Sequence, residues 1–327
     1  MFVNKPLTVI VAGSNDSGEI DILETAGLEV LILPDVIDDK AISHIRRADA
    51  LILGMKPLTA AVIEAAPTLK VIARHGVGYD NVDVKAATEA GIYVTNTPRS
   101  NTQTVAEFTI GLMINVTRRI ASSAAYVDSG HWRKPDFWGP ELCGRRLGLI
   151  GFGNIGKKVA ELASAFGMRI FVYDPFFDPA EGERHGVNCQ ELVNLLADSD
   201  IVSLHCALTR DTRFLIGTAE FERMKPGAYL INTARGGLID ENALLTAVES
   251  GSLAGAALDA LIQEPPDNSA LIDHPNILVT PHIAGWGVDA GRNMCIGAAE
   301  QVAQVLAGSK PKYAVNEPSK PRNIKTD

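Results

Sequence analysis

Short apolar runs alternate with amphipathic stretches through the first part of the chain. The runs cover residues 7–11, 30–33, 50–53, 71–73 and 92–94, and they are rich in valine, isoleucine and leucine. Buried strands have this length and composition, whereas the stretches between the runs place apolar residues on one face of a helix. The alternation predicts βαβ units and a parallel sheet.

A second series of apolar runs follows a long helical pattern that extends from about residue 102 towards residue 125. Its runs cover residues 147–150, 170–173, 201–204, 228–231, 255–258 and 277–279, and six strands suit a doubly wound sheet. An amphipathic helix over about residues 287–306 comes last and is expected to return to the first domain. Because 327 residues exceed the usual size of one hydrophobic core, two domains are expected.

The first run of the second series leads into a glycine-rich turn at Gly151, Gly153 and Gly156. In a dinucleotide-binding turn, the first glycine permits a tight reversal, the second lets the backbone approach a pyrophosphate, and the third allows close helix packing. The next run ends at Asp174, about 20 residues further on, where an acid binds the ribose 2′-hydroxyl. A carboxylate there repels the 2′-phosphate of NADP, and residues 175–177 supply no basic group, so NAD is favoured. An ordinary βα turn with a capping aspartate is the alternative reading.

The predicted fold class is therefore α/β, with two doubly wound parallel-sheet domains. A Rossmann NAD-binding domain, residues 103–287, is inserted in a flavodoxin-like substrate domain, residues 1–102 and 288–327. Ligands of such sheets bind beyond the carboxyl ends of the strands, so the functional residues are expected at those ends.

Composition restricts the partners and the compartment. The net charge is −9 at pH 7 and no stripe of Lys and Arg is present, so no nucleic-acid partner is expected. The four cysteines have no CxxC spacing, which argues against a metal site and a redox dithiol. The chain has no run of about 18 apolar residues and no leader-like N-terminus, so a cytoplasmic protein with no membrane partner is expected.

Four segments at the ends of predicted strands carry groups suited to nicotinamide chemistry. Oxidation of an alcohol needs a group that takes the hydroxyl proton and a cation that holds the substrate carboxylate, and histidine and arginine meet these needs. The segments are residues 74–81, 232–237, 258–266 and 280–286. Each residue also has a structural reading: Arg235 as a partner of Asp240, His282 as a buried loop histidine, and Glu264 as an exposed turn acid.

Taken together, these motifs resemble the D-2-hydroxyacid dehydrogenase family over nearly the whole chain. The resemblance rests on residues 74–83, 105–107, 151–156, 205–209, 232–237, 258–259, 264–265 and 281–282. It implies NAD-dependent interconversion of a small D-2-hydroxy acid and its 2-keto acid, of the glycerate, phosphoglycerate or hydroxypyruvate kind. It also implies that Arg235 binds the substrate carboxylate and carbonyl, that His282 exchanges the proton, and that Glu264 pairs with this histidine and stabilises its protonated form.

The resemblance assigns further residues to binding. For NAD these are Gly151, Gly153, Asn154, Ile155, Gly156, Asp174, His205, Thr212, Thr233, Ala234, Asp259 and Thr104, with Asp259 on the nicotinamide carboxamide. For the substrate they are Arg74, His75, Gly76, Val77, Gly78 and Lys56, with the backbone N–H groups of residues 76–78 on the carboxylate. A homodimer is implied through the cofactor domain, with residues 102–126 and 132–138 reaching across.

The chain departs from the family pattern in three places. Residues 206–207 replace a usual proline, Gly287 replaces a usual threonine, and Lys56 stands near the position of a phosphate-binding arginine. Lys56 supplies a point charge without a bidentate fork, which puts a phosphorylated substrate in doubt. Feedback through a C-terminal regulatory domain is not expected.

Two alternatives remain on the sequence alone. A formate or other dehydrogenase on this scaffold would keep the arginine and the histidine but replace the glutamate, and Glu264 argues against it. An NADH-sensing corepressor-type binding protein would keep all three residues, and turnover of 2-keto acids would distinguish it from an enzyme.

Overall fold

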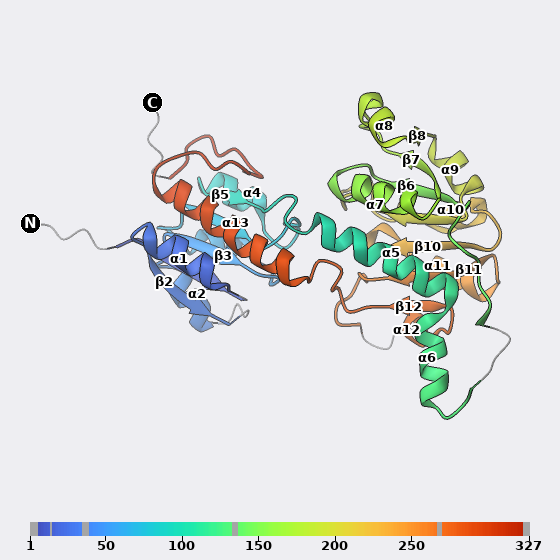
Figure 1. The fold of residues 1–327 in the computed structure, drawn as a ribbon. Coiled ribbons are helices and arrows are strands. Elements are labelled where there is room, and N and C mark those ends of the chain that lie inside the picture. Colours follow the sequence, from blue (N-terminus) through green and yellow to red (C-terminus); the bar gives the residue numbers. More distant parts are fainter. Residues whose placement is uncertain (1–5, 14, 35–38, 133–136, 267–269, 323–327) are drawn as a thin grey trace, which may run out of the picture. The chain divides into compact units, whose positions relative to one another are not determined.

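The computed structural model describes residues 6–13, 15–34, 39–132, 137–266 and 270–322 (Figure 1). The chain divides into two compact units, one made of Met1–Asn101 with Trp286–Asp327 and the other of Thr102–Gly285. The first, the discontinuous unit, is interrupted by the second, the inserted unit. The sequence places these limits one residue later at the first junction and two residues later at the second.

The discontinuous unit contains a five-stranded parallel sheet in the order β2-β1-β3-β4-β5. This is the flavodoxin-like order, in which the chain starts at an inner strand and winds to both sides. The predicted fold class is confirmed for this unit. The strands are β1 (Thr8–Ala12), β2 (Glu29–Leu33), β3 (Ala50–Leu53), β4 (Val71–Arg74) and β5 (Tyr93–Thr95).

Helices cover both faces of this sheet. Successive side chains of a strand point to opposite faces, and because the strands are apolar at successive positions, both faces must be buried. Val9 and Val11 pack with Leu23 and Val302, from α1 (Ser17–Thr25) and α13 (Val288–Leu306). Ile10 belongs to the core on the other face, which the remaining helices cover. These are α2 (Asp39–Ile45), α3 (Ala60–Glu64) and α4 (Val84–Glu89). The late helix α13 therefore completes a core that the first strand begins.

The inserted unit contains a seven-stranded parallel sheet in the order β12-β11-β10-β9-β6-β7-β8. The order reverses between β6 and β9, as it does in Rossmann sheets, and the predicted class is confirmed here too. The strands are β6 (Arg146–Ile150), β7 (Arg169–Tyr173), β8 (Asn188–Cys189), β9 (Ile201–Leu204), β10 (Ala228–Asn232), β11 (Leu253–Leu258) and β12 (Ile277–Val279).

Two helix layers enclose this sheet (Figure 1). Met113 and Val159 lie in the core on one face, from α5 (Thr102–Arg118) and α7 (Asn154–Ala165). The opposite core contains residues of α9 (Leu192–Asp198), α10 (Thr218–Arg223), α11 (Glu241–Glu249) and α12 (Ala270–Asp273). The remaining helices are α6 (Ile120–Asp128), α8 (Pro179–His185) and the short 3-10 helix η2 (Gly236–Leu238).

Two sequence predictions are wrong in the inserted unit. The helix expected from residue 102 towards 125 is two helices, because Arg119 adopts a left-handed conformation with φ of 52° and breaks the hydrogen-bond ladder. The sheet has seven strands rather than six, because β8 has two exposed residues and carries no apolar run that a sequence pattern could reveal.

No helix in the described parts of the chain combines the length and apolarity needed to cross a membrane. The longest helix, α13, buries Ala298 and Val302 in the core of its own unit, so its apolar face is already in use.

Candidate functional site

The glycine-rich turn joins β6 to α7 where the strand order of the inserted unit reverses. Gly151 has φ of 100°, and a Cβ there would lie 2.6 Å from the backbone nitrogen of Cys206, so only glycine fits. A Cβ on Gly156 would lie 2.3 Å from the Gly151 carbonyl oxygen, so this glycine lets α7 approach the strand. Gly153 is exposed, and a Cβ on it would meet nothing within 4 Å. The turn therefore leaves open space before α7.

The N-terminus of α7 has the properties of an anion site. Gly153 occupies the N-cap without a side-chain cap, and Asn154 begins the helix in an exposed position. The first N–H groups of a helix lack intrahelical acceptors, and the helix dipole is positive at this end. A pyrophosphate fits both the open space and the donors, so the residues present suit a dinucleotide.

Asp174, directly after β7, faces this turn. Its Oδ2 accepts from the Phe152 backbone N–H at 2.7 Å, and its Oδ1 accepts from the Phe176 backbone N–H at 2.8 Å. Each carboxylate oxygen has more than one lone pair, so the group can also accept from a ribose hydroxyl. Asp174 thus stiffens the turn and brings a negative charge to it.

Other residues expected at the cofactor follow β9 and β10. The ring Nε2 of His205 lies 2.9 Å from Ser203 Oγ, and burial lowers the pKa of His205 to about 3, so the imidazole is neutral. Thr212 closes the loop after β9, because its hydroxyl donates to the Ala207 carbonyl at 2.7 Å. Thr233 follows β10, and its hydroxyl lies 2.9 Å from that of Thr109 in α5. Two further expected residues, Thr104 in the first turn of α5 and Ala234, are half-buried.

His282 and Glu264 form a hydrogen-bonded pair in the inserted unit. The Nδ1 atom of His282 lies 2.7 Å from Oε2 of Glu264, and the other carboxylate oxygen accepts from the Leu261 backbone N–H at 2.9 Å. The side chains are 28% and 36% exposed, so the pair is accessible from solvent. One ring nitrogen is therefore committed to the glutamate, and Nε2 is the nitrogen available for another molecule.

Arg235 lies close enough to this pair to act on it electrostatically. Partial burial favours the neutral form of Glu264, but hydrogen bonds from His282 and Leu261 and the charges of His282 and Arg235 outweigh it, and together they lower the pKa of Glu264. The carboxyl is therefore an anion at neutral pH. Asn232, fully buried at the end of β10, holds the arginine segment, because its amide donates to the Arg235 carbonyl at 2.8 Å. The three residues with implied catalytic roles are thus neighbours.

Asp259 has a structural task that the sequence did not indicate. It is 1% exposed at the end of β11, and its carboxylate accepts from the Thr280 hydroxyl at 2.6 Å. It also accepts from the backbone N–H groups of Ile283 at 2.9 Å and Ala284 at 2.7 Å. Asp259 therefore holds the segment that carries His282, whose backbone adopts the uncommon φ of 55°. Its sequence signals were its place at a strand end and the family motif of residues 258–259, and neither indicated these bonds.

The expected substrate residues lie in the discontinuous unit, at the end of β4. Arg74 is 4% exposed, and its guanidinium donates to the carbonyls of Leu53, Gly54 and Gly78. The His75 side chain is 6% exposed and bonds to Glu19, so both side chains point into the unit and hold the loop. Gly76 is buried, whereas Val77 and Gly78 are half-buried. Lys56, after β3, is exposed.

The loop of residues 75–78 has further supports that sequence analysis missed. The Gly76 N–H donates to the Thr97 hydroxyl at 3.1 Å, and the Asn96 amide donates to the Val77 carbonyl at 2.7 Å. Thr97 and Asn96 follow β5, and Glu19 lies in α1. Glu19 and Asn96 lie 56 and 19 residues from their partners, and no motif marks them, so only the fold reveals their role.

The fold and these sites define a two-domain α/β protein with a Rossmann dinucleotide site. A family model described as "D-isomer specific 2-hydroxyacid dehydrogenase, NAD binding domain" matches residues 110–284. The chain belongs to the D-isomer specific 2-hydroxyacid dehydrogenase family, as the motifs of the sequence predict. The matched residues form an NAD-binding domain, and NAD is its cofactor.

Relatives of known name extend the match. The glyoxylate reductase of Thermofilum pendens is 42% identical over 289 residues, which cover 85% of this chain and 84% of the relative. The D-3-phosphoglycerate dehydrogenase of Archaeoglobus fulgidus is 38% identical over 315 residues, which cover 96% of this chain but 60% of the relative. The chain thus spans about 60% of the length of that enzyme. The crystal structure of the TT0316 protein from Thermus thermophilus superposes with a TM-score of 0.87 at 37% identity, covering 95% of this chain and 100% of that chain.

Proposed function

We propose that this chain is an NAD-dependent oxidoreductase that interconverts a small D-2-hydroxy acid and its 2-keto acid. The relatives named glyoxylate reductase and D-3-phosphoglycerate dehydrogenase support this reaction class. The observation that carries the proposal is the 2.7 Å bond between His282 Nδ1 and Glu264 Oε2, beside Arg235. This combination supplies a proton donor with a fixed orientation and a cation for a carboxylate.

His282 is the general acid and base. Because Nδ1 is bonded to Glu264, Nε2 faces the substrate oxygen. In reduction of a keto acid, the imidazolium donates the Nε2 proton to the carbonyl oxygen as it becomes a hydroxyl. In oxidation, the neutral imidazole takes the hydroxyl proton at Nε2. The carboxylate of Glu264 stabilises the protonated ring and fixes its orientation.

Arg235 binds the substrate carboxylate and polarises the neighbouring carbonyl. A guanidinium presents paired N–H donors that match a carboxylate. The buried amide of Asn232 supports this orientation, because it accepts from the Ala234 N–H at 3.0 Å and donates to the Arg235 carbonyl at 2.8 Å. NAD supplies or accepts the hydride when it is bound, while the residues of this chain bind the acid and move the proton.

The cofactor contacts follow the turn geometry. The open space at Gly153 and the N-terminus of α7 receive the pyrophosphate, and Asp174 receives the ribose hydroxyls. The carboxylate of Asp174 excludes a 2′-phosphate, which supports NAD over NADP. Asp259 acts on the nicotinamide end through the segment of residues 280–284 that it holds.

The family resemblance assigns the loop of residues 76–78, in the discontinuous unit, to the substrate. The Gly76 N–H already donates to the Thr97 hydroxyl at 3.1 Å, so we propose the backbone of Val77 and Gly78 as the donors to the substrate carboxylate. Gly76 has φ of 142°, a backbone conformation that favours glycine. The exposed Lys56 supplies one positive charge and no fork, which favours small unphosphorylated acids of the glyoxylate or hydroxypyruvate kind over phosphoglycerate.

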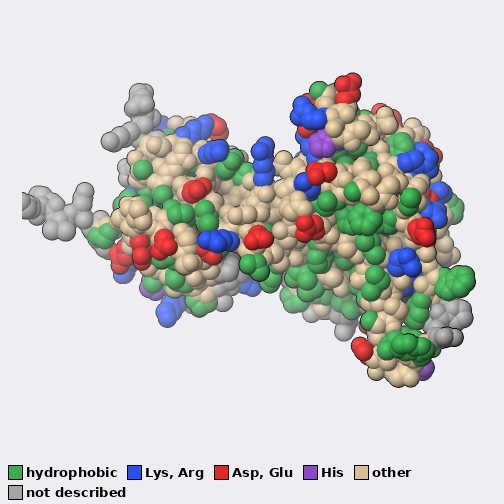
Figure 2. All heavy atoms as spheres, viewed as in Figure 1, with side chains coloured by type: hydrophobic (Ala, Val, Ile, Leu, Met, Phe, Trp, Pro, Cys, Tyr) green, Lys and Arg blue, Asp and Glu red, His purple; other side chains and the backbone are tan. Residues whose placement is uncertain are grey.

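We also propose a homodimer that forms through the inserted unit. Helix α6 buries none of its own residues, and Figure 2 shows hydrophobic side chains gathered around it. Large exposed apolar side chains occur at Ile120, Val127, Trp132 and Trp138, with Trp138 89% exposed. Residues 133–136 of the expected dimer segment lie outside the described part of the chain. A cytoplasmic location remains part of the proposal.

A substrate panel tests the proposed reaction. Purified protein with NADH is mixed with glyoxylate, hydroxypyruvate, pyruvate and 3-phosphohydroxypyruvate, and NADH absorbance is followed. Consumption with at least one of the four acids is expected. Tight NADH binding without any turnover would instead favour the NADH-sensing protein.

A further inference from the structure

The loop of residues 75–78 is fastened by a different side chain at each position. His75 bonds to Glu19 at 2.6 Å, Gly76 donates to Thr97 at 3.1 Å, Val77 accepts from Asn96 at 2.7 Å, and Gly78 accepts from Arg74 at 3.0 Å. A loop with two glycines loses much conformational entropy when it becomes ordered, and these hydrogen bonds offset that loss. Three of the four partners lie at the ends of the neighbouring strands β4 and β5, whereas Glu19 lies on the separate helix α1.

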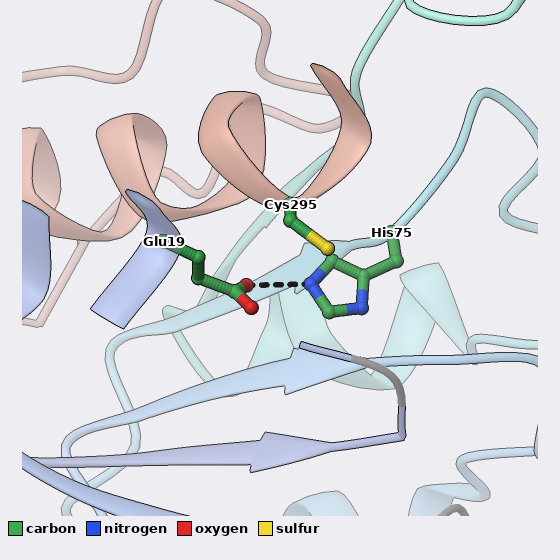
Figure 3. A group of neighbouring side chains, drawn as sticks. All are labelled: Glu19, His75 and Cys295. Carbon is green, nitrogen blue, oxygen red and sulfur yellow. Dashed lines mark hydrogen bonds and ion pairs between the residues drawn. The ribbon is translucent and has the colours of Figure 1, made fainter. Parts of the chain in front are cut away.

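Glu19 is the most deeply buried of these supports. Its side chain is 0% exposed in α1, and Oε1 lies 2.6 Å from Nε2 of His75 (Figure 3). Burying a carboxyl group is unfavourable unless it has a hydrogen-bond partner, so the positions of the Glu19 carboxyl and the His75 ring are coupled. The thiol of Cys295 from α13 lies within 4.8 Å of both groups. Figure 3 shows these side chains converging from three elements that are far apart in sequence.

Carboxylate, imidazole and thiol groups also bind zinc, but the distance between Glu19 Oε1 and His75 Nε2 is that of a hydrogen bond. Two ligands at roughly 2.0–2.1 Å from a tetrahedral zinc lie roughly 3.3 Å apart. Glu19 Oε1 and His75 Nε2 lie 2.6 Å apart, well inside that separation. The cluster is therefore a hydrogen-bonded support.

We propose that Glu19 is a positioning residue that, through His75, holds the loop of residues 75–78 in the conformation in which the backbone of Val77 and Gly78 binds the substrate carboxylate. The inference rests on the proposed function, because it assigns a support to the proposed binding loop. His75 is the first residue of the loop, and a Cβ on Gly76 would lie 3.7 Å from the sulfur of Met294, which neighbours Cys295. The loop thus rests on α13 on one side and is tied to α1 through Glu19.

The predicted kinetic signature is a change in KM with little change in kcat. The substrate carboxylate is not altered by the reaction, so its backbone contacts serve the ground state and the transition state equally. Loss of Glu19 therefore weakens keto-acid binding. It leaves NADH affinity unchanged, because the cofactor site lies in the inserted unit.

The test compares Glu19→Ala and Glu19→Gln with Asn316→Ala. Asn316 is a matched control: it is 8% exposed in the same unit, and it bonds to the backbone of Val94 and Ile92 and to the Thr88 hydroxyl. KM for the best keto acid is expected to rise roughly 10- to 100-fold in Glu19→Ala, which corresponds to one lost charge-assisted hydrogen bond. Glu19→Gln, which keeps the shape and one acceptor, is expected to show a smaller rise, and Asn316→Ala none.

A second background shows whether Glu19 acts through His75. In His75→Asn protein, adding Glu19→Gln should change KM no further. Thermal unfolding followed by calorimetry shows whether the discontinuous unit of each variant is folded, and NADH binding, followed by fluorescence, does so for the inserted unit. Equal KM values in Glu19→Gln and wild-type protein, or equal rises in Glu19→Gln and Asn316→Ala, would overturn the inference while leaving the function intact. A wild-type protein that reduces no keto acid would overturn the proposed function, and this inference with it.

Discussion

His282 Nδ1 lies 2.7 Å from Oε2 of Glu264, and this bond determines that Nε2 is the ring nitrogen available to a substrate. The glutamate itself is held by the Leu261 backbone, so the ring has a fixed orientation before any substrate arrives. Arg235 lies in the same unit and acts on the same carboxylate. The two residues to which we assign proton transfer and carboxylate binding thus follow two strands, β12 and β10, of the same sheet.

Replacement of His282 and Arg235 should separate their roles. His282→Gln should lower kcat by roughly 10²- to 10⁴-fold, because the general acid is lost while the substrate contacts remain. Arg235→Gln should lower kcat/KM and also raise KM, because the carboxylate loses its cation. Steady-state kinetics measure both. Small and equal effects in the two variants would contradict the assignment.

Acid should destabilise the folded protein by protonating Glu264. The folded protein lowers the pKa of this carboxyl below its ordinary value of 4.5, because the bonds from His282 and Leu261 and the nearby charges of His282 and Arg235 outweigh partial burial. A lowered pKa means that the stabilisation is present above pH 4.5 and is lost as the pH falls through the folded value. Thermal unfolding from neutral to acid pH checks this. The Glu264→Gln protein should lose less stability than wild-type protein over the acid range.

The glycine turn predicts opposite outcomes for two similar substitutions. Gly156→Ala places a Cβ 2.3 Å from the Gly151 carbonyl, so it should destabilise the fold by roughly 1–3 kcal/mol. Gly153→Ala meets nothing within 4 Å and should leave Tm unchanged, yet it should weaken NADH binding because its methyl group occupies the space for the pyrophosphate. Calorimetry and NADH titration distinguish the two. Normal NADH affinity in Gly153→Ala would show that the pyrophosphate lies elsewhere.

Asp174 should control the choice between NAD and NADP. Asp174→Asn removes the negative charge and keeps an acceptor for one of the two N–H groups, those of Phe152 and Phe176, that donate to the carboxylate. The ratio of kcat/KM for NAD to that for NADP is expected to fall roughly 10-fold or more, as a repulsive contact with the 2′-phosphate disappears. An unchanged ratio would place the discrimination in other residues.

The cysteines should differ in reactivity. Burial raises the pKa of Cys206 to about 11, and burial together with the charges of Glu19 and Asp16 raises that of Cys295 to about 12. Since the thiolate is the nucleophile, iodoacetamide at about pH 8 should modify the exposed Cys143 and Cys189 and spare the other two. Peptide mass spectrometry of the native protein provides the measurement, and labelling after unfolding provides the control.

Sequence reasoning succeeded where a requirement is local. Gly156 is needed because a Cβ there would lie 2.3 Å from the carbonyl oxygen of Gly151 in the same turn, so the residue type itself indicates the geometry. The order of apolar runs likewise implied both parallel sheets. Arg119 and β8 escaped detection, because a single left-handed residue and a two-residue strand change no periodicity.

Contacts between distant segments could not be predicted in the same way. His75 was expected near a substrate because it stands in a motif, but the direction of its side chain depends on Glu19 in another helix. The sequence assigned Asp259 to the cofactor. Its bonds to residues 280–284 depend on the pairing of β11 with β12, which only the structure shows. Such partners need the fold before they can be recognised.

The interrupted course of the discontinuous unit has a consequence for biosynthesis. Val9 and Val11 leave the ribosome early, yet Ala298 and Val302 of α13, which cover them, are translated after the whole inserted unit. The inserted unit can fold while the discontinuous unit still exposes one apolar face of its sheet. During that interval the nascent chain is open to chaperones and to aggregation, and the last helix to be made ends it.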